Sequence, residues 1–491
     1  MNDAPASVIA ALRQRALTQP GAPFIADGER WITFGEMWTL ACQVRHALLG
    51  RGAAAGARVV LEVPSQPWRF VAAYLGTHLA GAIAVPVSAS RSGANAAIVQ
   101  RTSAAVHLDT ASFSPFLEEC AKQAAAGKGD LDPPLPDPAT TADILFTSGT
   151  SGSPKGVILS HSAIRSAAAA TNEFIGNVAS DREVVTVPLS HSFGLGRVRC
   201  TVLSGGSMNV VPGLTFPALI LEAMADAHVT GLSSVPMTIA VLERLGEAEF
   251  ADVAARLRYL ELGSAPMPEE RKRALARMLP RSRICMHYGL TEASRSCFLE
   301  FNTDNDHLWS VGKPAPGVAI RVADEEDRIL SAGTQGIIQI RSPARMTGYW
   351  LDPQTSAAVC TDDGWLKTND LGILDEDGYL MLIGRADDQI NVGGKKVDPL
   401  VIERAALGIA GTRDAGCIGV NDPDGLAGQV PVLFLVVDEP QVFEVRRYLR
   451  QLAGALEPHE RPVRLVTVAE LPRTESGKLK RAQLRRCLAP A

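Results

Sequence analysis

The feature that most constrains this chain is a run of glycine and hydroxylated residues, TSGTSGSPKG, at positions 147–156. Apolar residues precede it at 144–146 and follow it at 157–159, which predicts a loop between two strands. Glycines let consecutive backbone N–H groups point into one concavity, and hydroxyl groups add donors, an arrangement suited to phosphate. The residues expected to bind phosphate are Thr147, Ser148, Gly149, Thr150, Ser151, Gly152 and Lys155.

The loop does not fit the Walker pattern of P-loop NTPases, in which glycine precedes the lysine and Ser or Thr follows it. Here Pro154 precedes Lys155 and Gly156 follows it. A flexible Gly/Ser surface linker is the other alternative. Strand-like segments on both sides of the loop argue against a linker, so the run predicts a phosphate loop of a different class.

The size and composition of the chain limit the number of domains and the classes of protein to consider. With 491 residues and 52.1 kDa, the chain exceeds one ordinary core, so two or more domains are expected. A net charge of −5 gives no indication of nucleic-acid binding. The eight cysteines lack CxxC spacing and the nine histidines form no HExxH, which argues against zinc and a disulfide framework. Free thiols, no signal-peptide pattern and no long apolar span predict a cytoplasmic protein without integral membrane association.

Strand and helix patterns alternate through the N-terminal part of the chain. Strands are expected at 59–63, 83–86, 184–187, 208–211 and 259–262, and a helix is expected at 68–79. This alternation predicts parallel sheets covered by helices. Turn signals become more frequent after residue 310, at short intervals around 318–322, 337–340 and 379–383. The second pattern predicts a more β-rich subdomain.

Four further motifs follow the loop in order: YGLTE at 288–292, TNDLG at 368–372, GRADD at 384–388 and PRTESGK at 472–478. Together with the loop, they resemble the motif series of the ANL superfamily of adenylate-forming enzymes. Each motif alone is weak, but five in the right order across nearly the whole chain are specific. The resemblance implies an α/β fold with a large N-terminal domain (1–386) of helix-covered sheets plus a β-rich subdomain. A small, mobile α+β C-terminal domain (387–491) would follow, hinged at Asp387.

The resemblance also implies a reaction, that of an AMP-forming acid–thiol ligase of the acyl-CoA synthetase type. Such an enzyme joins a small-molecule carboxylic acid to the α-phosphate of ATP, releases pyrophosphate and passes the acyl group to a thiol. ATP, Mg²⁺ and CoA are therefore implied, with the phosphopantetheine of an acyl carrier protein as the alternative acceptor. A luciferase-like or an inactive homologue is less favoured, and the presence of Lys478 and Glu292 argues against an inactive one.

Three catalytic roles follow from the motif matches. Lys478 is expected to bridge the carboxylate and the α-phosphate, where preorganised charge has the largest effect. Glu292 is expected to hold Mg²⁺ on the ATP phosphates, with Thr291 as a phosphate donor. A single carboxylate suffices because Mg²⁺ keeps most of its waters.

The nucleoside is expected to contact four residues. Tyr288 and Gly289 would lie against the adenine, although a tyrosine at a strand end is more often a core residue. Asp370 would accept hydrogen bonds from the ribose hydroxyls, and Arg385 would bind ribose or phosphate. Asn369 stands where the family often has glycine, which leaves the local backbone shape open.

The resemblance implies an acyl pocket with three parts, which are His191 and its neighbours, the segment with Gly263, Ser264 and Ala265, and the residues around Tyr288. It also counts His191 among the catalytic residues. Amino-acid-activating relatives carry an aspartate beside the position of His191, whereas its neighbours here are uncharged, so an amino acid substrate is disfavoured. Three arginines near these motifs leave a substrate with a second anionic group open, with surface salt bridges as the favoured alternative. These arginines are Arg197, Arg199 and Arg295.

Two segments near the C-terminus complete the expectations. Gly393 and Gly394 resemble the loop that lines the pantetheine tunnel, where glycines permit close approach of the thiol arm. CoA and a carrier protein present the same arm, so the loop does not separate them. Arg481, Arg485 and Arg486 are expected on a solvated helix face.

Overall fold

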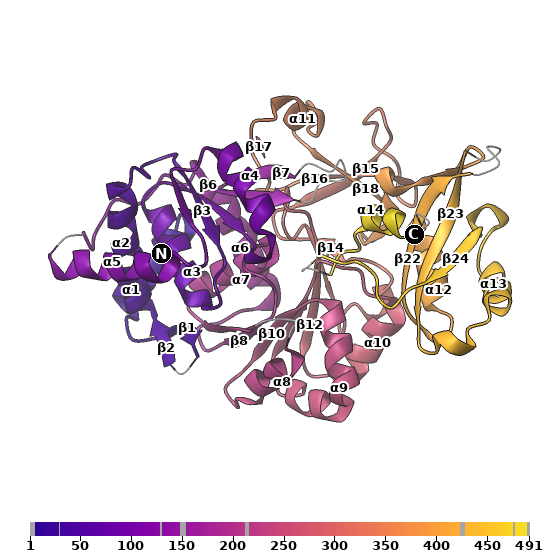
Figure 1. Cartoon of the computed structure of the whole chain (residues 1–491), viewed down its shortest axis with the longest axis horizontal. Helices are drawn as coiled ribbons and strands as arrows, with labels where there is room; N and C mark the ends of the chain where they lie inside the picture. Colours follow the sequence, from indigo (N-terminus) through magenta and orange to yellow (C-terminus); the bar gives the residue numbers. More distant parts are fainter. Residues whose placement is uncertain are drawn as a thin grey trace. The chain divides into compact units, whose positions relative to one another are not determined.

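A computed structural model describes residues 5–28, 30–127, 130–147, 154–211, 216–422, 428–474 and 477–488. The chain divides into two compact units (Figure 1). The first comprises residues 1–308, 312–319 and 340–366, and the second comprises residues 309–311, 320–339 and 367–491. The predicted boundary at Asp387 lies inside the second unit and stays a prediction.

A six-stranded sheet in the first unit carries the phosphate-loop segment. Its strands, in spatial order, are β17 (Gly348–Tyr349), β7 (Lys155–Ser160), β6 (Thr141–Thr147), β4 (Ile83–Val87), β3 (Arg58–Glu62) and β5 (Val106–Leu108). Strands β3, β4 and β5 pair in parallel, and α3 (Pro67–Leu79) connects β3 to β4. The predicted strands at 59–63 and 83–86, and the helix at 68–79, are thereby confirmed to within one residue at each end.

A nine-stranded sheet forms the other half of the first unit. Its order is β14 (Lys313–Pro314), β13 (Cys297–Glu300), β12 (Arg283–Tyr288), β11 (Tyr259–Leu262), β10 (Gly231–Ser234), β8 (Arg182–Val185), β9 (Ser207–Val210), β1 (Pro23–Asp27) and β2 (Arg30–Thr33). The central strands from β12 to β9 are parallel. Figure 1 shows α8 (Pro217–Ala225) and α9 (Pro236–Ala254) on the side opposite α6 (His161–Ile175) and α7 (Ser192–Ser204).

The remaining helices of the first unit are α1 (Val8–Thr18), α2 (Phe34–Gly50), α4 (Ser92–Thr102), α5 (Phe113–Ala125), α10 (Glu269–Met278) and α11 (Pro353–Ala358). Helix α2 begins after Thr33, which caps it. Thr33 accepts from the backbone N–H of Glu36, and the Glu36 carboxylate accepts from the N–H of Thr33, a reciprocal capping box.

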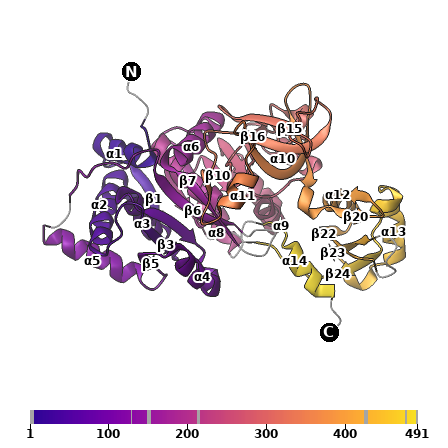
Figure 2. The same ribbon diagram turned by 90° about the horizontal axis from the view of Figure 1, so that it is seen from above.

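The second unit contains the β-rich segment and the C-terminal segment. Its sheets are β15 (Ala319–Ala323), β16 (Gln335–Arg341), β18 (Leu366–Leu374) and β19 (Leu380–Arg385); β20 (Ile390–Val392) and β21 (Lys395–Val397); and β22 (Thr412–Asn421), β23 (Gln429–Val437) and β24 (Arg464–Thr467). Figure 2 shows α12 (Pro399–Leu407) and α13 (Val445–Ala453) beside the last of these sheets. They cover one face of it, and Leu484 of α14 (Arg481–Leu484) packs on the other.

This architecture confirms the predicted α/β class, with helix-covered sheets followed by a β-rich segment and a C-terminal α+β segment. Among the described helices, none combines the length and apolar character needed to cross a membrane. All eight cysteines lie in described parts of the chain as free thiols, and only Cys487 is exposed.

Candidate active site

The phosphate loop joins two paired strands. Strand β6 ends at Thr147, and β7 begins at Lys155, which pairs directly with Thr147 in an antiparallel register. The Thr147 hydroxyl donates to the Lys155 carbonyl at 3.4 Å. Ser148, Gly149, Thr150, Ser151 and Gly152 lie outside the described residues. The described flanks therefore agree with a loop between two strands, as the sequence predicts.

Tyr349 links the lysine of this loop to the acid of the YGLTE motif. Its hydroxyl donates to Glu292 Oε1 at 2.8 Å, and Lys155 Nζ lies 5.2 Å from the centre of its ring. Tyr349 is held there because β17 pairs with β7, with Tyr349 opposite Val157. The sequence analysis missed this tyrosine, which brings an expected phosphate ligand and an expected metal ligand to one side chain.

The other expected residues of the first unit follow the carboxyl ends of neighbouring parallel strands. The segment after β8 leads to His191, the segment after β11 carries Gly263, Ser264 and Ala265, and the segment after β12 carries Gly289, Thr291 and Glu292. Tyr288 is the last residue of β12 and is buried. Open α/β sheets bind ligands at this edge, because all the carboxyl-end loops meet there.

Side chains around His191 show how these loops meet. His191 is the N-cap residue of α7. The ring of Phe193, in the first turn of α7, meets the ring of His287 edge-on at 4.7 Å between centroids. A Cβ added at Gly263 would stand 2.2 Å from the His287 ring, so the backbone after β11 needs glycine to approach β12 this closely. The three expected parts of the acyl pocket are thus adjacent in space.

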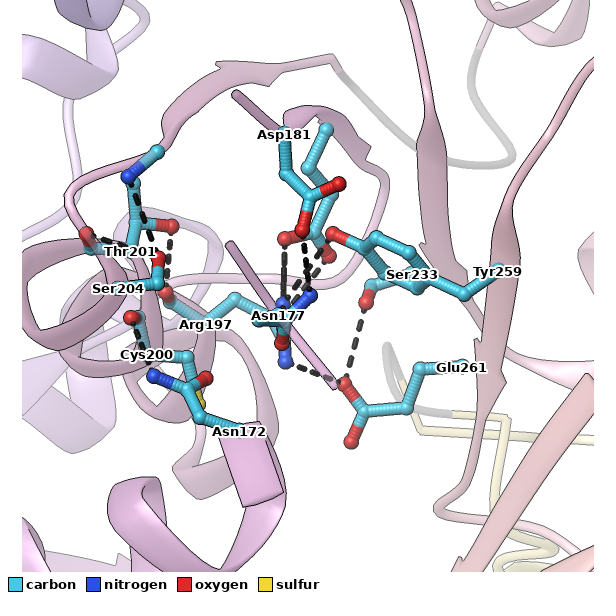
Figure 3. Close-up of polar contacts among 12 residues, drawn as sticks. Asn172, Asn177, Asp181, Arg197, Cys200, Thr201, Ser204, Ser233, Tyr259 and Glu261 are labelled. Atoms are coloured by element: carbon cyan, nitrogen blue, oxygen red, sulfur yellow. Dashed lines mark hydrogen bonds and ion pairs between the residues drawn. The ribbon is translucent and has the colours of Figure 1, made fainter. Parts of the chain in front are cut away.

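Arg197 and Arg295 are buried in ion pairs, so the expected surface salt bridges are wrong. The Arg197 guanidinium donates to Glu183 at 2.6 Å and pairs with Glu261 at 3.0 Å. It also lies beside Asn177 and Tyr259 (Figure 3). Arg295 donates to the other Glu261 oxygen at 3.1 Å. Burial alone would raise the pKa of Glu261, but Arg295 and Arg197 hold that pKa far below its usual value.

Arg199 faces the other way from Arg197. Two residues apart on a helix is about 200° of rotation, so the side chains leave α7 on opposite faces. Arg199 pairs with Asp143 of β6 at 2.5 Å and donates to the Tyr74 hydroxyl. Arg197 therefore fixes α7 to the nine-stranded sheet, and Arg199 fixes it to the six-stranded sheet.

The expected ribose-binding residues of the second unit are paired with each other. Asp370 of β18 stands opposite Arg385 of β19, and Arg385 Nη1 donates to Asp370 Oδ1 at 3.2 Å. Asn369 has a φ of +64°, a left-handed conformation that asparagine tolerates better than most residues. It therefore keeps the backbone shape that a glycine would adopt there. Its amide donates to Asp387 Oδ2 at 2.6 Å.

We expect Asn369→Ala to lower the free energy of unfolding by about 1–2 kcal/mol, because the backbone of an alanine is strained in the left-handed region. Asn369→Gly is the matched variant, since it also removes the amide but accepts the positive φ. Urea unfolding of the two variants separates backbone strain from the lost hydrogen bond. Equal stabilities for the alanine and glycine variants would contradict the strain argument.

Gly393 and Gly394 form the two-residue turn between β20 and β21. Their φ values are +58° and +84°, and positive φ at both central positions is typical of the type I′ turns that join antiparallel strands. Lys395 and Lys396 follow on β21 and are exposed. The turn thus presents backbone without side chains.

Lys478 is an exposed residue that follows Gly477, whose φ is +81°. Nearby Arg481 is mostly buried and pairs with Glu403 and Asp388, so its expected position on a solvated face is wrong. Arg485 is exposed, and the side chain of Arg486 lies outside what the structure describes. Lys478, Asp370, Arg385 and the Gly393–Gly394 turn belong to the second unit, whereas the other expected site residues belong to the first.

Comparisons with known proteins identify the family of both parts of the chain. A family model described as AMP-binding enzyme matches residues 12–350, and the AMP-binding enzyme C-terminal domain matches residues 401–478. The acyl-CoA ligase sidI of Aspergillus fumigatus is 33% identical over 71% of this chain and 61% of its own length. The indoleacetate–CoA ligase of Aromatoleum aromaticum is 30% identical over 74% of this chain and 70% of its own.

Solved structures agree over a greater length. ATP-bound MatB from Rhodopseudomonas palustris is 26% identical, with a TM-score of 0.86 over 98% of this chain and 99% of that chain. By contrast, the chain spans between 61% and 65% of the length of each of the first three curated relatives.

Proposed function

Because the chain belongs to the AMP-binding enzyme family, within the ANL superfamily that its motifs predict, we propose that it is an AMP-forming acid–thiol ligase. It would activate a carboxylic acid with ATP and transfer the acyl group to CoA. Loading of a carrier-protein phosphopantetheine is the second candidate, because the Gly393–Gly394 turn suits either thiol arm.

The observation that carries the proposal is the convergence of Lys155 and Glu292 on Tyr349, beside the phosphate loop. A lysine next to a carboxylate suits a polyphosphate that arrives with a divalent cation, since each charge has a counterpart. The carboxyl-end loops around His191 and Gly263 then supply the neighbouring acyl pocket.

The proposed reaction has two steps, each of which forms one bond and breaks another. A substrate carboxylate oxygen attacks the α-phosphorus of ATP, and the bond to the departing pyrophosphate breaks. The acceptor thiolate then attacks the acyl carbonyl carbon, and AMP leaves with the bonding electron pair. Lys478 would stabilise the first transfer by meeting negative charge on the carboxylate and the α-phosphate. Asp370 and Arg385 would hold the ribose, and Tyr288 the adenine.

Glu292 fits a magnesium ligand by its chemistry. Mg²⁺ binds through one or two carboxylates and keeps several waters. Tyr349 donates to Oε1 of this carboxylate, and the carboxylate would supply an oxygen ligand to the metal. When bound, Mg²⁺ would neutralise charge on the ATP phosphates.

We expect Glu292→Gln to raise the magnesium concentration needed for half-maximal pyrophosphate release by about tenfold. The amide keeps the shape and the Tyr349 contact but removes the charge that attracts the metal. Glu270→Gln, an exposed acid on α10, is the matched control. A magnesium titration that coincides with the control at normal turnover would remove Glu292 from the site.

We propose a substrate acid without a second charged group. Glu183 and Glu261 compensate Arg197 and Arg295, so these buried arginines carry no surplus positive charge for a second carboxylate. The neighbours of His191 likewise offer no carboxylate to an α-ammonium group. Aromatic and aliphatic monocarboxylic acids both satisfy these conditions.

One experiment tests activity, acyl class and acceptor together. A panel of monocarboxylic, dicarboxylic and amino acids is assayed for pyrophosphate release, and for thioester with CoA or with a phosphopantetheinylated carrier protein. We expect release with monocarboxylic acids and thioester with CoA. Thioester with the carrier protein alone would establish the second candidate, and no release with any acid would refute adenylation.

A further inference from the structure

The turn that carries Lys478 is closed by backbone and side-chain contacts on both sides. Arg473 and Leu479 form an antiparallel bridge. The Thr474 N–H donates to the Lys478 carbonyl at 2.8 Å, and the Lys478 N–H donates to Thr474 Oγ1 at 3.0 Å. The Gly477 N–H also donates to the Thr474 carbonyl at 2.8 Å. The backbone of Lys478 is therefore fixed, although its side chain is exposed.

Arg473 connects this turn to the sheet of the C-terminal segment. Its Nε and Nη2 donate to the two carboxylate oxygens of Asp414 at 3.0 and 2.6 Å, a bidentate pair. Its Nη1 donates to the Gly477 carbonyl at 2.8 Å. Asp414 lies on β22 beside a register shift and pairs with Val436 of β23, so its backbone is anchored in the sheet. The side chains of Arg473 and Asp414 are 25% and 17% exposed, which limits screening of the pair by water.

We propose that Arg473 is a positioning residue for Lys478. Its guanidinium has a fixed planar geometry, so one side chain holds the Asp414 carboxylate and the Gly477 carbonyl at set positions. That carbonyl belongs to the residue immediately before Lys478. The pair thus fixes the direction in which the lysine leaves the turn. This inference rests on the proposed function, in which Lys478 acts in adenylate formation.

The step most sensitive to such positioning is adenylation. A displacement of about 1 Å in a catalytic group costs up to about 10² in rate. We expect Arg473→Met to slow single-turnover pyrophosphate release by about 30–100-fold. Arg473→Lys keeps the charge without the bidentate geometry, so we expect a loss of about tenfold. Asp414→Asn should slow pyrophosphate release by about as much as Arg473→Lys does. Thioester formation from pre-made acyl-adenylate should stay within about twofold of wild type, since it does not use Lys478.

Arg413→Met is the matched control. Arg413 is the neighbour of Asp414 on β22 and pairs with Asp438 at 3.5 Å, so its loss removes an ion pair from the same strand without touching the turn. We expect wild-type rates in both half-reactions for this variant. Thermal unfolding of all variants identifies any that fail to fold. If Arg473→Met fails to fold, the milder Arg473→Lys still tests the proposal.

A double substitution separates positioning from a general effect. If Arg473 acts through Lys478, Arg473→Met adds nothing to the adenylation defect of Lys478→Ala, because the two residues act as a unit. A multiplicative loss in the double variant, or equal loss in both half-reactions, overturns the proposal. So does an Arg473→Met rate equal to that of Arg413→Met. A wild-type rate for Lys478→Ala alone would instead refute the assigned role of Lys478.

Discussion

Replacement of Lys478 by alanine is expected to slow adenylate formation by about 10²–10³, the usual cost of losing one preorganised contact to a developing negative charge. Lys478 is exposed on a closed turn, so its truncation removes charge without leaving a cavity. Pyrophosphate release in a single turnover measures this half-reaction. Thioester formation from pre-made acyl-adenylate measures the other, and we expect it to be largely intact.

Lys480→Ala is the matched control for this variant, because it removes the same charge two residues further along. We expect near-wild-type adenylation from the control. Comparable losses in both half-reactions of Lys478→Ala would show that the lysine supports the fold of the segment. In that case the match of PRTESGK to the family motif would not imply a catalytic role for Lys478.

Proline at position 387 is expected to leave adenylation within a few-fold of wild type but to slow acyl transfer by about tenfold or more. Lys478 and the Gly393–Gly394 turn belong to the same C-terminal segment, yet each is expected to serve a different half-reaction. A rotation at a hinge between the two steps resolves this conflict. Proline fixes φ near −65° and removes an N–H, so it restricts a hinge at this position.

The local structure makes this test specific. Asp387 lies in a short 3₁₀ turn (Ala386–Asp388), whose usual φ of about −50° to −70° includes the proline value. Asp387→Ala is the control, because it removes the carboxylate that accepts from Asn369 without fixing the backbone. Wild-type rates of both half-reactions in the proline variant would place the hinge elsewhere or make rotation unnecessary.

The sequence predicted the fold well where local pattern determines it. Strand β11 was predicted at 259–262 and is found there, because a short run that is apolar except for Glu261, and is followed by glycine, is enough to identify a buried parallel strand. The loop between two strands at 147–155 was likewise predicted from strand-like runs on both sides of a glycine-rich segment, whereas the antiparallel pairing of these strands was not. Side-chain contacts between segments that are far apart in the sequence were not predictable in this way.

Tyr349 shows why. It contacts Glu292 from 57 residues further along the chain, and only the pairing of β17 with β7 brings it there. The arginines of α7 show the same limit. Glu183, Glu261 and Asp143 are single acids on separate strands, so no local pattern indicates that each meets a guanidinium. Arginines on a helix suggest surface ion pairs until the sheets on both sides of that helix are known.

The distribution of thiols gives this protein a built-in labelling site. Six of its cysteines are buried, Cys360 is half-buried, and Cys487 alone is exposed. Burial raises the pKa of Cys42 and of Cys120 to about 12, which suppresses the reactive thiolate at both positions. A maleimide dye should therefore attach at Cys487 in a Cys360→Ser background, with the other cysteines left in place. Fluorescence from this single position near the C-terminus would report movement of the segment in real time as ATP, acid and thiol are added in turn.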